Sequence, residues 1–345
     1  REAVMNGYCC IACNTAQPAD FDGFVCPSCG GNLQITYDYD AARRELGGRF
    51  ESGDGIFRFA PLLPVSRLKE PFPLRVGGTP LYRARRLGEA VGLRKLYLKD
   101  DSGNPSASFK DRATAITLQR ARDIGASTVA VASTGNAGSS TACIAAALGL
   151  DAIVLVPENA PPAKLTQSLA YGATVLAVRG TYDDAYDLCL EACDEFGWFN
   201  RSTGFNPFTR EGKKTCSYEI WESLGHVPDR VVVPTGDGNI LSGIWKGWCD
   251  LQAVGFIDTL PKLDSARANR DTVADSISVI QPRDELAAEQ AVAESGGETL
   301  VVPDEEILAA IPEIASATGV FAEPAAAAPW AALKRMVQNL SLIHI

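Results

Sequence analysis

The chain has 345 residues, of which 46% are apolar and 21% charged, and it carries a formal net charge of -10. Its length allows two or three domains with ample core, and its acidity argues against a nucleic-acid binder, which normally shows a basic face. No apolar run approaches ~18 residues, and no charged-then-apolar leader precedes a small-residue cleavage site, so neither a membrane span nor secretion is indicated. We therefore expect a cytoplasmic protein that binds neither nucleic acid nor membrane.

Two CxxC pairs lie near the start of the chain, Cys10 with Cys13 and Cys26 with Cys29, separated by twelve residues. This spacing is close to that of a zinc ribbon. The alternatives are two chance pairs or reducible disulfides, and Cys9 could take the place of Cys10 in the register. We predict a structural zinc site made by these four thiolates, which leave the metal no open position, in a module of residues 8 to about 40 that needs its metal to fold.

The middle of the chain predicts an α/β fold. Residues 40–75 carry charges and prolines and are predicted to be a linker with short structure. From about residue 79, β-branched or apolar runs alternate with amphipathic stretches, which is typical of parallel, doubly wound α/β layers. Strands are predicted at 95–99, 128–132, 152–157, 174–178 and 230–234, and helices at 108–124, 137–148, 162–171 and 182–196. Cys189 and Cys193 share one face of the last helix and are expected in its core.

The first candidate site is the segment 104–112, which follows a predicted strand. A helix is expected to begin near Ser108, so Lys110 would lie in its first turn, where the positive end of the helix dipole disfavours a cation. A lysine with a lowered pKa is what imine formation needs. A solvated surface lysine is the plain alternative at such a position.

Two further loops of small residues follow predicted strands, where α/β sheets bind ligands. Residues 133–140 could hold a carboxylate or phosphate with the N–H groups of the coming helix, and Asn136 offers a donor and an acceptor to an aromatic hydroxyl. Residues 234–243 have the pattern of a phosphate cup built from backbone amides. Asp237 suits such a cup only if its carboxylate points away. Three such loops after three strands favour one shared crevice over three unrelated turns.

These motifs, in this order, resemble the fold-type II pyridoxal phosphate (PLP) enzymes and, within them, the threonine synthases. The segment 108–112 (SFKDR) follows Gly78-Thr79-Pro80-Leu81, and the supporting stretches are 133–137, 236–240, 272–277 and 319–324. The CxxC prefix looks like the zinc ribbon of many bacterial and archaeal members. The resemblance covers residues 8 to about 335 and implies two doubly wound α/β subdomains preceded by a small zinc ribbon.

The resemblance also implies an organisation and a set of residue roles. Residues 1–45 would contain the ribbon and the start of the linker, and 46–345 the catalytic domain, with a smaller mobile subdomain at about 110–205. Lys110 would bind PLP as a Schiff base and then move protons, and Asn136 would hydrogen-bond the 3'-hydroxyl of the cofactor. The phosphate of PLP would be held by Gly236, Asp237, Gly238, Asn239 and Ile240. Ser133 and Thr134 would hold the substrate carboxylate, and Ser108 and Arg112 are candidates for the substrate phosphate. Helix capping by Ser108 and a surface salt bridge of Arg112 are the alternatives.

The implied reaction is that of a lyase in threonine biosynthesis: O-phosphohomoserine and water give threonine and phosphate, with PLP as electron sink. Threonine dehydratase or a cysteate synthase-like enzyme is the alternative within the superfamily. A non-catalytic protein with a zinc ribbon and a PLP-like domain is the alternative from another class. A homodimer is expected by analogy alone.

The chain departs from this family in two places. Relatives have a strand and a helix between the segments like 260–263 and 271–277, where this chain has only 264–270. The sequence therefore predicts that a sheet element is missing and that its neighbours expose unpaired backbone. The family also places a Ser or Thr against the pyridine nitrogen, in a turn expected here beyond residue 345. The start at Arg1 and the segment 341–345, which lacks a helix-ending signal, lead us to expect a fragment.

Overall fold

The computed structural model describes residues 5–68 and 70–343, and only the backbone of 340–343. Residues 1–4 of the predicted ribbon module and the last two residues of the segment 341–345 lie outside the described residues. The chain forms two compact units: unit 1 contains residues 1–78, 101–216 and 250–256, and unit 2 contains residues 79–100, 217–249 and 257–345. Within the described ranges, no helix combines the length and apolar character that crossing a bilayer requires.

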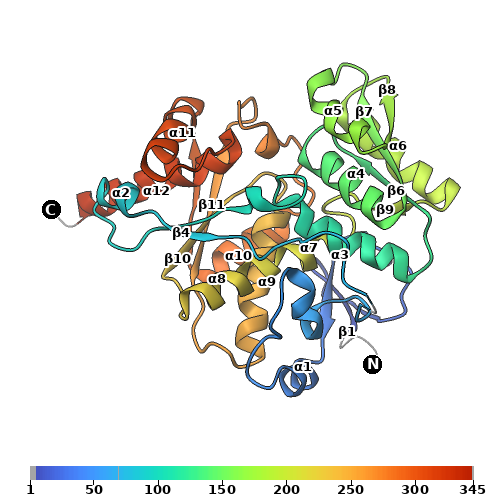
Figure 1. The fold of residues 1–345 in the computed structure, drawn as a ribbon, viewed down its shortest axis with the longest axis horizontal. Coiled ribbons are helices and arrows are strands. Elements are labelled where there is room, and N and C mark those ends of the chain that lie inside the picture. The colour runs from blue at the N-terminus through green and yellow to red at the C-terminus, as the bar shows by residue number, and fades with distance from the viewer. Residues whose placement is uncertain (1–4, 69, 344–345) are drawn as a thin grey trace. The chain divides into compact units, whose positions relative to one another are not determined.

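Unit 1 contains a parallel α/β layer and a small antiparallel sheet (Figure 1). Its elements are β1 (Met5–Cys10), β2 (Ala16–Pro18), β3 (Leu33–Tyr37), α1 (Tyr39–Leu46), α3 (Lys110–Asp123), β6 (Thr128–Ala132), α4 (Asn136–Leu148), β7 (Asp151–Pro157), α5 (Pro162–Ala170), β8 (Thr174–Val178), α6 (Tyr182–Phe196), β9 (Phe199–Asn200) and α7 (Phe208–Lys213), with short 3-10 helices at Ile56–Leu62 and Asp101–Gly103. The predicted helices and the strands at 128–132, 152–157 and 174–178 are confirmed to within two residues at either end. The stretch 40–75, predicted as a linker, holds most of α1 and a 3-10 helix.

The parallel sheet of unit 1 has the order β8-β7-β6-β9. Ala130 and Leu155 pack with α6, whose Cys189 and Cys193 are buried as predicted. Val154 faces α4 instead, because a Cβ at Gly138 would lie 3.2 Å from its side chain. Since successive side chains of a strand point to opposite faces, α4 and α6 cover the two faces of this sheet. The predicted doubly wound arrangement is therefore confirmed here.

Helix α3 is buried along nearly its whole length and packs against α7. The two backbones come very close at Gly212, where a Cβ would lie 1.9 Å from the carbonyl oxygen of Arg112. Only a glycine fits such an approach, because any side chain would push the helices apart.

Unit 2 contains a parallel sheet of order β10-β11-β12 and an antiparallel pair, β4 and β5. Its elements are β4 (Leu81–Arg83), α2 (Arg85–Glu89), β5 (Tyr97–Lys99), β10 (Arg230–Pro234), β11 (Lys262–Ala268), a 3-10 helix at Asp275–Ile277, α10 (Glu285–Ser295), β12 (Thr299–Val302), α11 (Asp304–Thr318) and α12 (Pro324–Ile343), while α8 (Thr215–Leu224) and α9 (Asn239–Ala253) have residues in both units. The strand predicted at 230–234 is confirmed. The one predicted at 95–99 is shorter, and it pairs antiparallel with β4 rather than joining a parallel layer.

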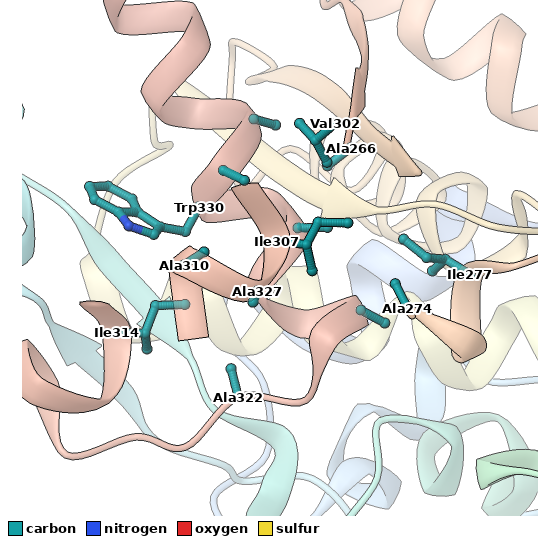
Figure 2. Close-up of a cluster of buried hydrophobic side chains, with 14 of the residues drawn as sticks. Ala266, Ala274, Ile277, Val302, Ile307, Ala310, Ile314, Ala322, Ala327 and Trp330 are labelled. Carbon is teal, nitrogen blue, oxygen red and sulfur yellow. The ribbon is translucent and has the colours of Figure 1, made fainter. Parts of the chain in front are cut away.

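The core of unit 2 is rich in alanine (Figure 2). Helix α11 contributes Ile307, Ala310 and Ile314, and α12 contributes Ala327 and Trp330, all buried. Small side chains let α11 and α12 approach each other closely, and the two helices pack along their length. The alanine-rich stretch near residues 325–332 is therefore core.

The prediction that the sheet of unit 2 lacks an interior element is wrong in one respect. Residues 264–268, which were predicted to be part of a connection without a strand, belong to β11. This strand pairs with β10 on one side and β12 on the other. Its buried Asp264 is accommodated because Arg230 donates to both carboxylate oxygens at 2.7 and 2.6 Å. Between Ala268 and Asp275 the described chain has no helix.

Candidate functional site

Lys110 is the first residue of α3, close to where the sequence places it. Its backbone N–H donates to the hydroxyl of Ser108 at 3.2 Å, so Ser108 satisfies one of the free amides at the helix start. Ala107, which directly precedes Ser108, has a φ of +59°, and this backbone conformation is unfavourable for any residue with a Cβ. Strained backbone next to a reactive group is common at functional sites.

Two charged residues that follow Lys110 point into the core of unit 1. Asp111 is fully buried and accepts hydrogen bonds from the backbone N–H and the hydroxyl of Ser106, at 2.7 and 2.6 Å. Burial raises the pKa of the Asp111 carboxyl, and the hydrogen bonds from Ser106 oppose that rise. Arg112 is also fully buried. It pairs through Nε and Nη2 with both oxygens of Asp101, at 2.6 and 2.9 Å, and donates from Nη1 to Thr215.

These contacts bear on the two interpretations of Ser108 and Arg112. The Ser108 hydroxyl accepts from the Lys110 N–H, as in the plain alternative, although Phe109 is the N-cap residue of α3. Arg112 has an ion pair, a buried one rather than the surface pair considered above. A bidentate arginine–carboxylate pair fixes both partners. Asp101 was not predicted, because its only signal in the sequence is its place in the polar turn before the helix.

The second loop, after β6, lies in the same unit as Lys110. The Ser133 hydroxyl accepts from the N–H of Gly135 at 3.2 Å, and Ser133, Thr134 and Asn136 are half-buried. Helix α4 begins at Asn136 and packs against α3. The Ser140 hydroxyl of α4 donates to the Thr114 hydroxyl at 2.7 Å, and Thr114 donates to the carbonyl of Lys110 at 3.0 Å. The starts of the two helices are thus linked by hydrogen bonds.

The third loop, residues 235–239 of unit 2, joins β10 to α9. The carboxylate of Asp237 accepts from the N–H of Asn239 at 3.1 Å, so it caps the helix. Within the part of the chain that the structure describes, the backbone N–H groups of Gly236, Asp237 and Gly238 donate to no protein acceptor. Consecutive free amides before a helix N-terminus fit a phosphate group. The donors of this loop are therefore suited to the phosphate of PLP.

Sequence reasoning missed Asp284, which lies behind this loop. It is buried, its N–H donates to the carbonyl of Asp237 at 2.9 Å, and its Oδ2 accepts from the Asn239 amide and the Ser242 hydroxyl. The only signal in the sequence was an Asp directly before a helical stretch, which usually caps its own helix.

The four ribbon cysteines form one cluster in unit 1. The sulfur atoms of Cys10, Cys13, Cys26 and Cys29 all lie within 4.8 Å of one another. Cys29 Sγ lies 3.4 Å from Cys13 Sγ and 3.5 Å from Cys10 Sγ. Hydrogen bonds from Thr15 lower the pKa of the Cys13 thiol to about 6. Cys9 is outside the cluster.

The two knuckles of the ribbon have the same local geometry. The N–H of Asn14 donates to the carbonyl of Cys10 at 2.9 Å, and the N–H of Gly30 donates to that of Cys26 at 2.8 Å. Asn14 and Gly30 both have a left-handed backbone, with φ of 60° and 72°. Four converging thiols are a donor set that fits a tetrahedral metal such as zinc.

Comparison with known proteins identifies relatives along most of the chain. The sequence pattern of the family described as "Pyridoxal-phosphate dependent enzyme" matches residues 73–342. The threonine synthase of Methanosarcina acetivorans is 36% identical over 351 residues, covering 95% of this chain and 86% of that protein. The threonine synthase of Methanocaldococcus jannaschii is 36% identical and covers 96% of this chain and 87% of that protein.

Solved structures support the same fold. Maize serine racemase matches with a TM-score of 0.65 at 20% identity, covering 74% of this chain and 82% of that chain. Threonine deaminase isoform 2 from Solanum lycopersicum matches with a TM-score of 0.66 at 21% identity, covering 76% and 75%. The fold-type II architecture expected from the sequence is therefore confirmed.

Proposed function

This chain belongs to the pyridoxal-phosphate dependent enzyme family, and we propose that it is a carbon–oxygen lyase acting on a phosphate ester. Its reaction would be that of a threonine synthase, in which O-phosphohomoserine and water give threonine and phosphate. The observation that carries this proposal is the place of Lys110 at the start of buried helix α3, in a chain that matches threonine synthases along nearly all of its length.

The proposed roles concern cofactor binding, proton transfer and substrate binding. Lys110 would hold the cofactor through its Nζ and then move protons at Cα and Cβ of the substrate. Asn136 would hydrogen-bond the 3'-hydroxyl of PLP, and the loop 236–240 would bind its phosphate. When bound, PLP supplies an electron sink for the negative charge that develops next to the substrate nitrogen. Ser133 and Thr134, at the N-terminus of α4, would bind the substrate carboxylate, since helix N-termini favour anions.

The two candidates for the substrate phosphate have other partners. The hydroxyl of Ser108 accepts from the Lys110 N–H, and Arg112 is paired with Asp101. We propose that both keep the start of α3 in place rather than contact the substrate. Breaking the buried Arg112 pair would leave an uncompensated charge, which is costly.

The four thiols of the ribbon would hold a structural zinc ion. Their number and mutual distances support this assignment, and four protein ligands leave the metal no position for substrate. That the protein is a homodimer stays a prediction.

The test uses purified protein supplied with PLP. We expect a visible absorbance band from lysine-bound PLP and release of phosphate from O-phosphohomoserine. Lys110→Ala should lose both, whereas Lys164→Ala, which removes an exposed lysine from the first turn of α5, should keep both.

The alternatives give different outcomes in the same assay. Deamination of threonine without phosphate release would point to a dehydratase, and turnover of phosphoserine would point to a cysteate synthase-like enzyme. A wild-type protein with no visible band would favour a non-catalytic role. Each of these results would contradict the proposed reaction.

A further inference from the structure

The glycine loop of unit 2 (residues 235–239) is shaped by the segments packed behind it. A Cβ at Gly236 would lie 2.8 Å from the Cα of Ile277. Gly238 has a φ of +94°, and a Cβ there would lie 2.6 Å from the carbonyl oxygen of Asp284. Both distances are shorter than real Cβ contacts, so the loop has no room to shift toward these segments.

Asp284 is the polar group that joins this loop to the start of α10. Its side chain is 2% exposed, and a buried carboxylate is stable only when hydrogen bonds replace water. It stands at the N-cap position of α10, but its side chain does not cap that helix. Instead, its Oδ2 accepts from Asn239 Nδ2 at 2.9 Å and from Ser242 Oγ at 2.8 Å, both in the first turn of α9.

The backbone of Asp284 adds a third contact. Its N–H donates to the carbonyl of Asp237 at 2.9 Å, inside the loop. One residue therefore fixes the loop and the helix that follows it, and hydrogen bonds to a charged acceptor are the stronger kind. With the carbonyl of Asp237 and the side chain of Asn239 engaged behind the loop, the N–H groups of residues 236–238 remain available for a ligand.

We propose that Asp284 is a positioning residue that holds the glycine loop in its phosphate-binding shape. This inference rests on the proposed function, in which residues 236–240 bind the phosphate of PLP. A negative charge near an anion site weakens binding by repulsion. The role of Asp284 therefore lies in its hydrogen-bond geometry, and an uncharged acceptor of the same shape should serve as well.

The experiment measures the Kd for PLP of the apo-protein and the 31P NMR signal of the bound phosphate. In Asp284→Ala, we expect PLP to bind roughly ten- to a hundredfold more weakly, as for the loss of hydrogen bonds to a charged group, and the 31P signal to shift or broaden. In Asp284→Asn, the amide oxygen can still accept from Asn239 and Ser242. Its Kd should stay within about threefold of the wild type, with an unchanged 31P signal.

A matched control is Glu313→Ala in the same unit. Glu313 also accepts from two side chains, Trp330 Nε1 and Lys334 Nζ, but it lies in α11. Its loss should leave the Kd and the 31P signal unchanged. If Asp284→Ala does not fold, Ser242→Ala removes one of the two side-chain donors and should weaken PLP binding by roughly threefold to tenfold.

The outcomes separate this inference from the proposed function. A wild-type protein that binds no PLP would overturn the proposed function. If the wild type binds PLP but Asp284→Ala or Ser242→Ala keeps its Kd and its 31P signal, the positioning role alone is overturned. It is equally overturned if Asp284→Asn binds as weakly as Asp284→Ala.

Discussion

In unit 1, the side chain of Lys214 lies fully buried between the carboxylates of Glu211 and Asp250, at 2.5 and 2.7 Å. Each carboxylate also accepts from a tyrosine hydroxyl, Glu211 from Tyr37 and Asp250 from Tyr39, both at 2.5 Å. Unit 2 is different, because alanine makes up much of the apolar core that its strands and helices share. Unit 1 thus contains a buried lysine held between two carboxylates, and unit 2 contains an apolar core made largely of closely packed alanines.

The difference teaches that the two units are sensitive to different changes. A buried ion pair is costly to break, because the remaining partner is a charge without water. An alanine-rich interface is sensitive to added volume, because its helices have no space to separate. The polar network of unit 1 also connects β3 of the ribbon and α1 to α7. The ribbon is therefore part of the core of unit 1.

Removal of the proposed zinc ion should produce the largest effect. Metal binding contributes about 10 kcal/mol or more to the folding of small zinc modules. We expect a strong chelator to increase hydrogen exchange in β1 and β3, with little change in α12 of unit 2. Metal analysis before and after chelation, with exchange followed by mass spectrometry, checks this. Cys9→Ser should keep the metal and Cys10→Ser should lose it; unchanged protection of β1 after the metal is gone would contradict the prediction.

Lys214→Met should cost about 3–5 kcal/mol of unfolding free energy, because it leaves two buried carboxylates without their cation. Urea unfolding monitored by circular dichroism measures this. The control is Lys334→Met in unit 2, whose pair with Glu313 is partly exposed. That change should cost less than about 1 kcal/mol. Equal effects of the two substitutions would remove the contrast between the units.

Ala310→Leu should cost about 1–3 kcal/mol, because it forces extra volume into the core shown in Figure 2. Ala309, its neighbour on α11, is exposed, so Ala309→Leu should change the stability by less than about 0.5 kcal/mol. Thermal unfolding of the two variants gives the comparison. A similar loss in both would mean that the alanine core tolerates added volume.

The smallest effect is a gain in stability. Ala107→Gly should stabilise the protein by about 1 kcal/mol, because glycine adopts a positive φ without strain. Ala126 lies in another loop of unit 1 and has no positive φ, so Ala126→Gly should destabilise slightly instead. Denaturant midpoints of the two variants test this. A loss of stability in Ala107→Gly would mean that the strain at residue 107 is absent.

The sequence predicted elements well where local signals are strong. The β-branched runs of β6 and β8 and the capping box of α6 give those elements their observed bounds. The strand β11 was missed, because its Asp264 and Ser265 look unlike a buried strand. Asp264 can be buried because Arg230, 34 residues earlier, and the N–H of Glu298, 34 residues later, both donate to its carboxylate.

The same limit applies to the candidate site. A helix that begins near Ser108 with Lys110 in its first turn was predicted from local signals, and α3 begins at Lys110 itself. The cysteine cluster follows from the spacing of the two CxxC pairs and was also predicted. The contacts of Asp284 with Ser242 and Asn239 of α9 join residues 42 and 45 positions apart. No local sequence pattern predicts contacts over such separations. The Arg112–Asp101 pair lies nearer in sequence, but the burial of an arginine depends on the helices around it.

Gly212 has a consequence for anyone who engineers this protein. Because a Cβ at Gly212 would lie 1.9 Å from the carbonyl oxygen of Arg112, a methyl group at this point would force α3 and α7 apart. Helix α3 is 14 residues long and begins with Lys110. A side chain at position 212 would therefore tilt the whole helix and displace Lys110. A misplacement of about 1 Å at a reacting group can cost about a hundredfold in rate. A mutant library designed to change the substrate or the reaction should therefore keep Gly212, although Gly212 is not one of the proposed binding residues.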